Sequence, residues 1–166
     1  MHYDGLLLTF PKEIKVFIAT FVVILSVGFY TGLLFVNQTS TTTPSGVEEN
    51  YLGNEEDEAA EVMKFKKGER EMLTIIHTHI LSMSFIFFLL GILVWLAKLP
   101  KNLKYFLTVE PFVSVILTFG GIYLLWTGML WMKYIVVFSG ILMTLTFTVS
   151  AILVLYQLYK RSPKTS

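Results

Sequence analysis

The chain has 166 residues and is 54% hydrophobic but only 15% charged, with a mean hydropathy of +0.66. This composition is too apolar for an ordinary soluble domain of this length, so it indicates an integral membrane protein. The formal net charge is +1, and the basic residues are spread along the chain in small groups, which argues against a basic face for nucleic acid. The lack of cysteine excludes disulfides, thiolate metal sites and cysteine nucleophiles.

Four apolar segments predict four transmembrane helices. Each is close to or longer than the ~20 residues that a helix needs to cross a bilayer, and none alternates as a barrel strand would. We therefore predict an all-α, up-down bundle of four helices. In chain order the parts are a cytoplasmic segment (1–15), a helix (16–36), an extracytoplasmic loop (37–72), a helix (73–97), a cytoplasmic loop (98–104), a helix (105–126), an extracytoplasmic turn (127–133), a helix (134–159) and a cytoplasmic tail (160–166).

The basic residues predict the orientation of the bundle. Eight of them flank the helices on the side that holds both termini, and five lie on the opposite side. The positive-inside rule then puts both termini in the cytoplasm, and we expect a multi-pass protein of a bacterial inner membrane. The eight are Lys12, Lys15, Lys98, Lys101, Lys104, Lys160, Arg161 and Lys164, and the five are Lys64, Lys66, Lys67, Arg70 and Lys133.

The first loop is acidic, because nine of the twelve acids lie between Glu48 and Glu71. Within it, "NEEDEAAEVMKFKKGEREML" predicts a short amphipathic helix with Asn54 as its N-cap, acids in the first turns and lysines later. A solvated charged hairpin is the alternative. In either form the loop would attract a cationic soluble partner, such as a basic electron carrier.

Small residues predict how the helices pack, because lipid gives helices no hydrophobic reason to associate. Such residues recur every seven positions on the second and third predicted helices, which must run antiparallel. The predicted contacts are Gly91 with Ser114, Ser84 with Gly121, and His77 with Gly128.

The first predicted helix carries Gly28 and Gly32, a small-xxx-small pattern that is typical of close helix contacts. The pattern alone does not decide between a contact within the chain and a contact with another chain. We therefore keep both alternatives open.

Glu110 and Pro111 stand near the predicted start of the third helix. Proline costs no hydrogen bond in a first turn, and an acid there suits the helix dipole. We therefore interpret the pair as a helix start rather than as part of a proton relay.

His77 and His79 are the main candidates for a functional site. Two residues apart on a helix, their side chains point about 200° apart, so they form two sites rather than one pair. His77 lies on the predicted small-residue seam, and we predict that it is the buried functional group. His79 lies on a stripe with Met72 and Met83.

Haem b is one ligand that these residues would suit. An imidazole can be an axial ligand, and Gly128 opposite His77 would leave room for a porphyrin. A second ligand would come from Met129, Met132 or another subunit.

Copper is the second candidate, because imidazole and thioether groups suit it. The predicted ligands are His77, His79, Met72 and Met83, with Met129 and Met132 near the same membrane face. A third possibility is a quinol site or a proton relay at that face, since imidazole exchanges protons near neutral pH.

These patterns predict an accessory or cofactor-holding subunit of a membrane redox or metal-handling assembly. We expect it to bind other membrane subunits or a second copy of itself, and we do not expect it to be an enzyme on its own. The alternative is a cofactor-free channel, transporter component or structural subunit, with Ser139, Thr146 and Ser150 as the polar stripe of an oligomeric channel.

Overall fold

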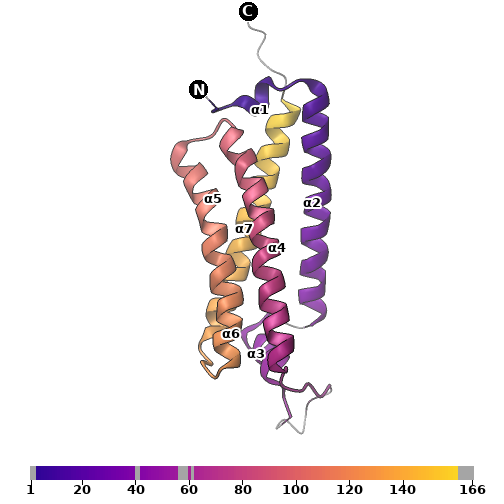
Figure 1. Cartoon of the computed structure of the whole chain (residues 1–166), viewed down its shortest axis with the longest axis vertical. Helices are drawn as coiled ribbons and strands as arrows, with labels where there is room; N and C mark the ends of the chain where they lie inside the picture. The colour runs from indigo at the N-terminus through magenta and orange to yellow at the C-terminus, as the bar shows by residue number, and fades with distance from the viewer. Residues whose placement is uncertain (1–2, 40–41, 56–59, 61, 161–166) are drawn as a thin grey trace, which may run out of the picture.

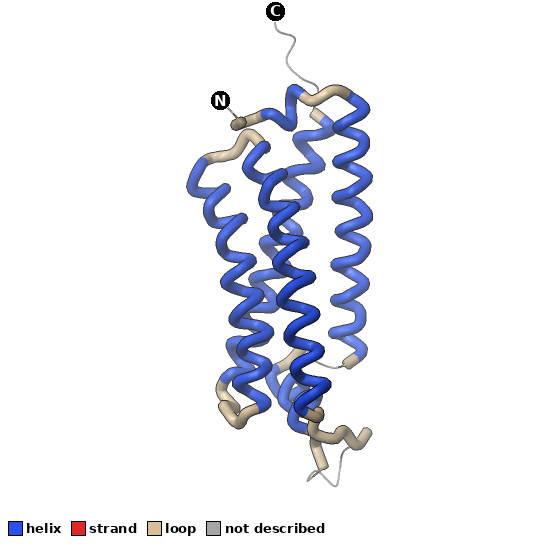
Figure 2. The backbone as a smooth tube through the Cα atoms, viewed as in Figure 1, coloured by secondary structure: helices blue, strands red, loops and turns tan. Residues whose placement is uncertain are grey.

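The computed structural model describes the whole chain except residues 1–2, 40–41, 56–59, 61 and 161–166. Four long helical segments form an up-down bundle, and no strand occurs in the described part (Figure 1, Figure 2). All four are long and apolar enough to cross a membrane. They are α2 (Lys12–Gln38), α4 (Glu69–Leu96), the continuous run of α5 (Lys101–Val115), η1 (Ile116–Gly120) and α6 (Gly121–Trp126), and α7 (Met132–Tyr159). The predicted all-α, four-helix architecture is therefore confirmed.

Helix α7 is the centre of the bundle, and it contacts every other helix. Helix α2 stands at the side of the bundle, on the far side from α5 (Figure 1), and it packs mainly against α7. In the most apolar stretch of α7, 39% of the residues are buried, whereas in that of α2 only 11% are buried. The bundle core therefore lies between α4, the α5 to α6 run and α7.

One aromatic cluster joins α2 to this core. The rings of Phe29 and Phe147 stack with centroids 3.9 Å apart, and Phe87 of α4 meets both rings edge-on at 6.2 to 6.3 Å. Phe147 is completely buried. This cluster fixes α2 against α7 and α4 near the middle of their lengths.

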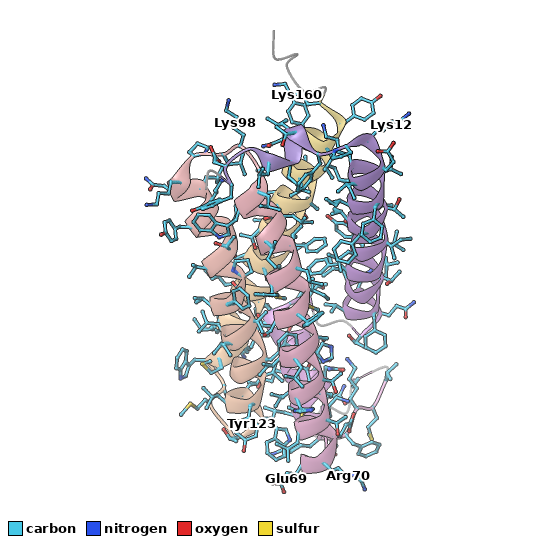
Figure 3. The ribbon with its side chains drawn as sticks, turned by 45° about the horizontal axis from the view of Figure 1, so that its top comes forward. Lys12, Glu69, Arg70, Lys98, Tyr123 and Lys160 are labelled. Carbon is cyan, nitrogen blue, oxygen red and sulfur yellow. The ribbon has the colours of Figure 1, made fainter. Side chains whose placement is uncertain are left out.

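The two ends of the bundle differ. Lys12, Lys98 and Lys160 lie at the end that holds the first and last described residues, here called the terminal end, whereas Glu69 and Arg70 lie at the opposite end, the loop end (Figure 3). Short helix α1 (Leu6–Thr9) covers part of the terminal end.

Side chains tie the terminal end together. Gln157 of α7 accepts a hydrogen bond from the Lys98 backbone N–H at 2.7 Å and donates one to its carbonyl at 3.2 Å. The Lys15 ammonium donates to the carbonyls of Leu8 and Lys160 at 2.9 and 3.3 Å. These bonds connect α7 to the α4–α5 connection, and α2 to α1 and the end of α7.

The loop end contains helix α3 (Pro44–Leu52), which Thr43 caps by accepting from the Gly46 N–H at 3.1 Å. The amphipathic helix predicted from Asn54 is wrong for the described residues, since 62–68 is not helical. Asn54 is not an N-cap: its side chain accepts from the Lys64 N–H at 2.6 Å and donates to the Val62 carbonyl at 3.0 Å. The Asn54 side chain therefore holds the two ends of the loop together instead of capping a helix. Residues 56–59 and 61 of that segment lie outside the described part.

The predicted contacts between the second and third helices are wrong. A Cβ on Gly91 would lie 3.5 Å from Thr108, not near Ser114, and a Cβ on Gly121 would meet Val136 of α7 at 2.9 Å. The third helix contains a π-helical turn, η1, whose extra residue rotates the side chains after it relative to those before it. Small residues at heptad spacing therefore do not stay on one face.

Pro111 is not at a helix start, because the third helix begins at Lys101 and Pro111 lies inside α5. The first charged turn, with Lys101 and Lys104, is helical although it precedes the apolar part. Proline has no N–H, so the Leu107 carbonyl lacks the donor that it would have in a regular helix. Glu110 and Pro111 accordingly lie within the membrane-spanning part of the helix.

Candidate functional site

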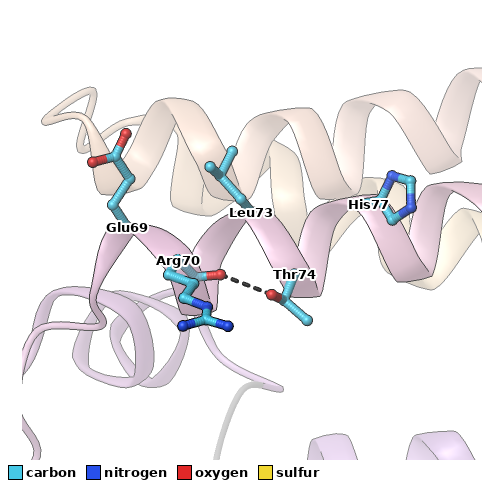
Figure 4. A pocket seen from close by; sticks show the side chains of 5 residues that line it. All are labelled: Glu69, Arg70, Leu73, Thr74 and His77. Carbon is cyan, nitrogen blue, oxygen red and sulfur yellow. Dashed lines mark hydrogen bonds between the residues drawn. The ribbon is translucent and has the colours of Figure 1, made fainter.

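His77 is exposed and lies on the outward face of α4, in line with Leu73 and Leu81. It lines an open pocket near the loop end together with Leu73 and three polar residues, Glu69, Arg70 and Thr74 (Figure 4). The prediction that His77 is buried on a seam opposite Gly128 is therefore wrong. Because lipid gives an apolar helix no preference for one face, the spacing of small residues does not show which face of α4 meets its neighbours.

His79 lies on a different face from His77, as the spacing predicts, and it is partly buried. Its Nδ1 is 2.7 Å from the Ile75 carbonyl, and its ring stacks on Phe119 with centroids 4.8 Å apart. An Nδ1–H that donates to Ile75 would leave Nε2 with its lone pair, the form that binds metals.

The other residues predicted for a cofactor lie in separate surroundings. Met72 and Met132 are buried, Met83 is partly buried, and Met129 is exposed. Gly128 has a positive φ of 112° and shapes the turn before α7, rather than opposing a histidine. Among the described residues, no three His, Cys, Asp or Glu side chains could hold one metal ion.

The largest group of buried polar side chains lies elsewhere, between α5–η1 and α7. We call it the polar seam, and its members are Glu110, Ser114 and Thr118 on one side and Ser139, Thr146 and Ser150 on the other. Each is at most 8% exposed. The hydroxyl stripe that would suit an oligomeric channel therefore faces the interior of this chain.

Hydrogen bonds cross and follow the polar seam. The hydroxyls of Thr118 and Ser139 share a bond of 2.7 Å, and Ser139 also donates to the Ile135 carbonyl at 2.8 Å. Ser114 donates to Oε1 of Glu110. Because Glu110, Ser114 and Thr118 are four residues apart in turn, they present one polar line to α7.

Two polar atoms of the seam are buried without a hydrogen-bond partner among the described residues: Oε2 of Glu110 and Oγ of Ser150. The antiparallel pairs Thr118–Ser139 and Gly121–Val136 fix the register of the two helices. Continued toward the terminal end at about 1.5 Å per residue, this register puts Glu110 level with Phe147, next to Thr146, and Ser150 about one turn further on. The two unpartnered atoms thus belong to adjacent layers of one interface.

Glu110 forms no ion pair with any residue that the structure describes. The basic residue of α5 that precedes it, Lys104, is buried and points about 120° away around the helix. Its ammonium donates to Asp4 at 2.6 Å and to the Trp95 carbonyl at 2.8 Å. The Glu110 carboxyl group therefore depends on hydroxyls alone.

The backbone near Glu110 is irregular on both sides. Pro111 follows Glu110 directly, and the π-helical turn η1 begins at Ile116, six residues after Glu110. Single π-helical turns inside α-helices are frequent at functional sites, because they reorient side chains and loosen the backbone ladder. The irregularity coincides with the polar seam, and Phe119 of η1 also stacks on His79.

The sequence does contain a signal for this site. A carboxylate followed by hydroxyls four and eight residues later, inside an apolar run, is expensive in a membrane and therefore marks a functional candidate. Placing the helix start too late made Glu110 resemble a helix terminus.

Residues 41–165 match a protein family named Aq_1264_TM, which is described as a transmembrane helical domain. The match includes α3 to α7 and therefore the whole polar seam, whereas α1 and α2 precede it. No curated protein and no solved structure matches the chain significantly.

Proposed function

Since the chain belongs to this family of transmembrane helical domains, we propose that it is a small multi-pass membrane subunit that binds and releases a proton at Glu110 within the membrane. The observation that carries the proposal is the carboxyl group of Glu110, which is 8% exposed, has no cation partner, and leaves Oε2 without a hydrogen bond in the described part of the chain.

The argument is the cost of charge in the membrane interior. A charged side chain at the centre of a membrane helix costs about 3 kcal/mol on insertion scales, and a counter-ion or a proton relieves that cost. Glu110 has no counter-ion within the described part of the chain, so a proton is the simplest neutralising partner.

Protonation would also change which bonds Glu110 makes. A carboxylate only accepts hydrogen bonds, whereas the neutral acid has an O–H to donate. The Ser150 hydroxyl and the Leu107 carbonyl lie in the adjacent layer and could accept it. Proton binding would then alter the α5–α7 interface, next to the proline and the π-helical turn.

A proton-binding subunit without a redox centre or nucleotide site needs other subunits to supply energy. We therefore propose that the chain works within a larger membrane assembly, with its termini in the cytoplasm. A cationic soluble partner at the first loop would have to compete with lysines, since Glu48 pairs with Lys133 and Glu49 with Lys64 at 3.6 Å.

The pH dependence of stability tests the proposal. Glu110→Gln imitates the neutral acid, so wild type should lose stability relative to this variant as the pH rises, because only wild type must then bury a charge. Thermal unfolding in detergent at several pH values would show the difference. Glu69→Gln, at an exposed acid, is the control and should show little pH-dependent difference. A pH-independent difference for Glu110→Gln would contradict the proposal.

A second candidate function is a cofactor-holding role at His79, with haem b or copper. The observation in its favour is the Nδ1 contact with Ile75, which suits Nε2 for coordination. The other ligands would have to include thioethers or another chain. The absorption spectrum and metal content of the purified protein, compared with those of His79→Ala and His77→Ala, test it. A colourless sample without copper would rule out this role.

A further inference from the structure

We propose that the open pocket on the outward face of α4 binds the head group of a phospholipid with a primary ammonium group, phosphatidylethanolamine, from the leaflet at the loop end. Glu69 binds the ammonium, Arg70 binds the phosphate, and His77 binds the ester oxygens of the glycerol. The proposal is independent of the role of Glu110, and it gives His77 a ligand that is neither a metal nor a haem.

The pocket holds one acidic and one basic side chain that are both available to a ligand. Glu69 and Arg70 are exposed, and neither takes part in an ion pair with a residue that the structure describes. Glu71, by contrast, binds the Lys67 ammonium at 2.5 Å. A carboxylate and a guanidinium side by side match a zwitterion, whereas an anionic head group would meet the charge of Glu69.

The hydrogen-bond donors of the pocket are Arg70 and His77. The Thr74 hydroxyl donates to the Arg70 carbonyl at 2.8 Å, so its proton is already used (Figure 4). His79 is bonded to Ile75 and stacked on a phenylalanine, whereas His77 makes no hydrogen bond or ring contact with the described residues. A guanidinium and an imidazole are suitable donors to phosphate and ester oxygens.

The position of the pocket along α4 fits a lipid head group. The helix has 28 residues and is about 42 Å long, close to the ~40–45 Å of a bilayer with its head-group regions. Trp126, a residue type of the membrane interface, donates to the Lys67 carbonyl at 2.8 Å, just before α4 begins. Glu69 and Arg70 therefore lie at the level of the head groups. His77 lies about 10 Å deeper, and its side chain slants back toward the helix start.

Below the pocket, the same face of α4 is apolar. Leu81, Phe85 and Phe88 follow His77 by four, eight and eleven residues and are 55 to 66% exposed. The pocket volume of about 620 Å³ is within the range of ~300–1,000 Å³ that is usual for small-molecule sites. A head group in the pocket would therefore have its acyl chains along this apolar face.

Lipid binding by the purified protein tests the proposal. The full chain is delipidated in detergent and titrated with dioleoyl phosphatidylethanolamine, phosphatidylcholine or phosphatidylglycerol, and the bound lipid is counted by native mass spectrometry. All three lipids share the phosphate and the glycerol esters, but choline has no N–H and glycerol has no cation. We expect the ethanolamine lipid to bind at least about fivefold more tightly than the other two, since only its ammonium donates to the Glu69 carboxylate.

Four variants and their controls assign the groups. Glu69→Gln should remove the preference for the ethanolamine lipid, whereas Glu55→Gln, at another exposed acid of the loop end, should keep it. Arg70→Gln should weaken the binding of all three lipids by about tenfold, and His77→Leu should weaken all three as well. Lys66→Gln removes an exposed positive charge at the same end but outside the pocket, and it should have little effect.

Equal affinities of wild type for the three lipids, or tighter binding of the glycerol lipid, would overturn the proposal. Unchanged binding by Arg70→Gln, or an equal loss in Lys66→Gln, would also overturn it, because the attraction would then not depend on the pocket. All substituted positions are exposed, so the bundle should fold in each variant. None of them changes Glu110, so a failure here leaves the pH-dependent effect of Glu110→Gln intact.

Discussion

Helices α2 and α7 have nearly the same length, 27 and 28 residues, and are equally apolar, yet only 11% of the most apolar stretch of α2 is buried, against 39% of that of α7. Hydropathy therefore determines that both helices enter the membrane, but not which of them becomes the centre of the bundle. The difference lies in how their polar side chains are used.

On α2, three hydroxyls bond back to the helix that carries them, whereas the Tyr30 hydroxyl shares a hydrogen bond of 2.7 Å with Thr148 of α7. Thr20, Ser26 and Thr31 donate to backbone carbonyls three or four residues earlier, at 2.7 to 2.9 Å. On α7, Ser139 also meets Thr118, and Gln157 pins the backbone of Lys98. Polar groups that reach another helix specify position, because lipid cannot replace their partner.

Removing the central ring of the aromatic cluster should give the largest effect on this difference. Phe147→Ala leaves a cavity where Phe29 of α2 stacks, so we expect a loss of about 3 kcal/mol in unfolding free energy. Phe138→Ala, at a 66% exposed position on the same helix, is the control and should cost far less. Denaturation in mixed micelles would measure both, and equal losses would contradict the assignment of the core.

A methyl group added to a glycine should distinguish α6 from α2. Gly121→Ala forces a Cβ to within 2.9 Å of Val136, so it should cost about 1–3 kcal/mol of stability. Gly28→Ala meets nothing within 4 Å and should be neutral or stabilising, because alanine favours helix. Thermal unfolding of the two variants checks the contrast. A destabilising Gly28→Ala would instead indicate that α2 packs against another chain.

The ion pair at the terminal end should give the smallest effect. The hydrogen bond from Lys104 holds the pKa of Asp4 below its ordinary value of 3.8, opposed by partial burial. A lowered pKa in the folded state means that this stabilisation is present above pH 3.8 and is lost as the pH falls through the lower folded value.

Asp4→Asn should therefore reduce stability at neutral pH by at most about 1 kcal/mol, since the aspartate is half exposed. The difference from wild type should shrink below pH 3.8. Glu13→Gln is the control at the same end. A deficit in Asp4→Asn that persists undiminished in acid would indicate that the loss is not due to the carboxylate charge.

The sequence predicts the four helices well, because apolar runs of this length have few other structures available to them. It does not predict which faces meet, since apolar side chains point to lipid and to protein alike. His77 illustrates this, because its heptad partners suggested a buried seam while its helix face is outward. The π-helical turn in the third helix has no clear sequence mark, and it rotates Gly121 toward α7.

Glu110 illustrates a different limit. The residue types of the candidate site are visible in the sequence, but their meaning depends on where the helix begins. Lys101 and Lys104 resemble loop residues by charge, yet they form the first turn of α5. If that turn is assigned to the loop, Glu110 lies near the start of the helix. Because the turn is in fact helical, Glu110 lies well inside the helix as a buried acid.

Infrared difference spectroscopy of the purified protein in lipid tests the central claim most directly. If Glu110 binds a proton in the membrane interior, a pH change should produce a C=O stretching band of a neutral carboxylic acid, which shifts in deuterium oxide and is absent from Glu110→Gln. Persistence of the same band in Glu110→Gln, or no such band in wild type at any pH at which the bundle is folded, would contradict it.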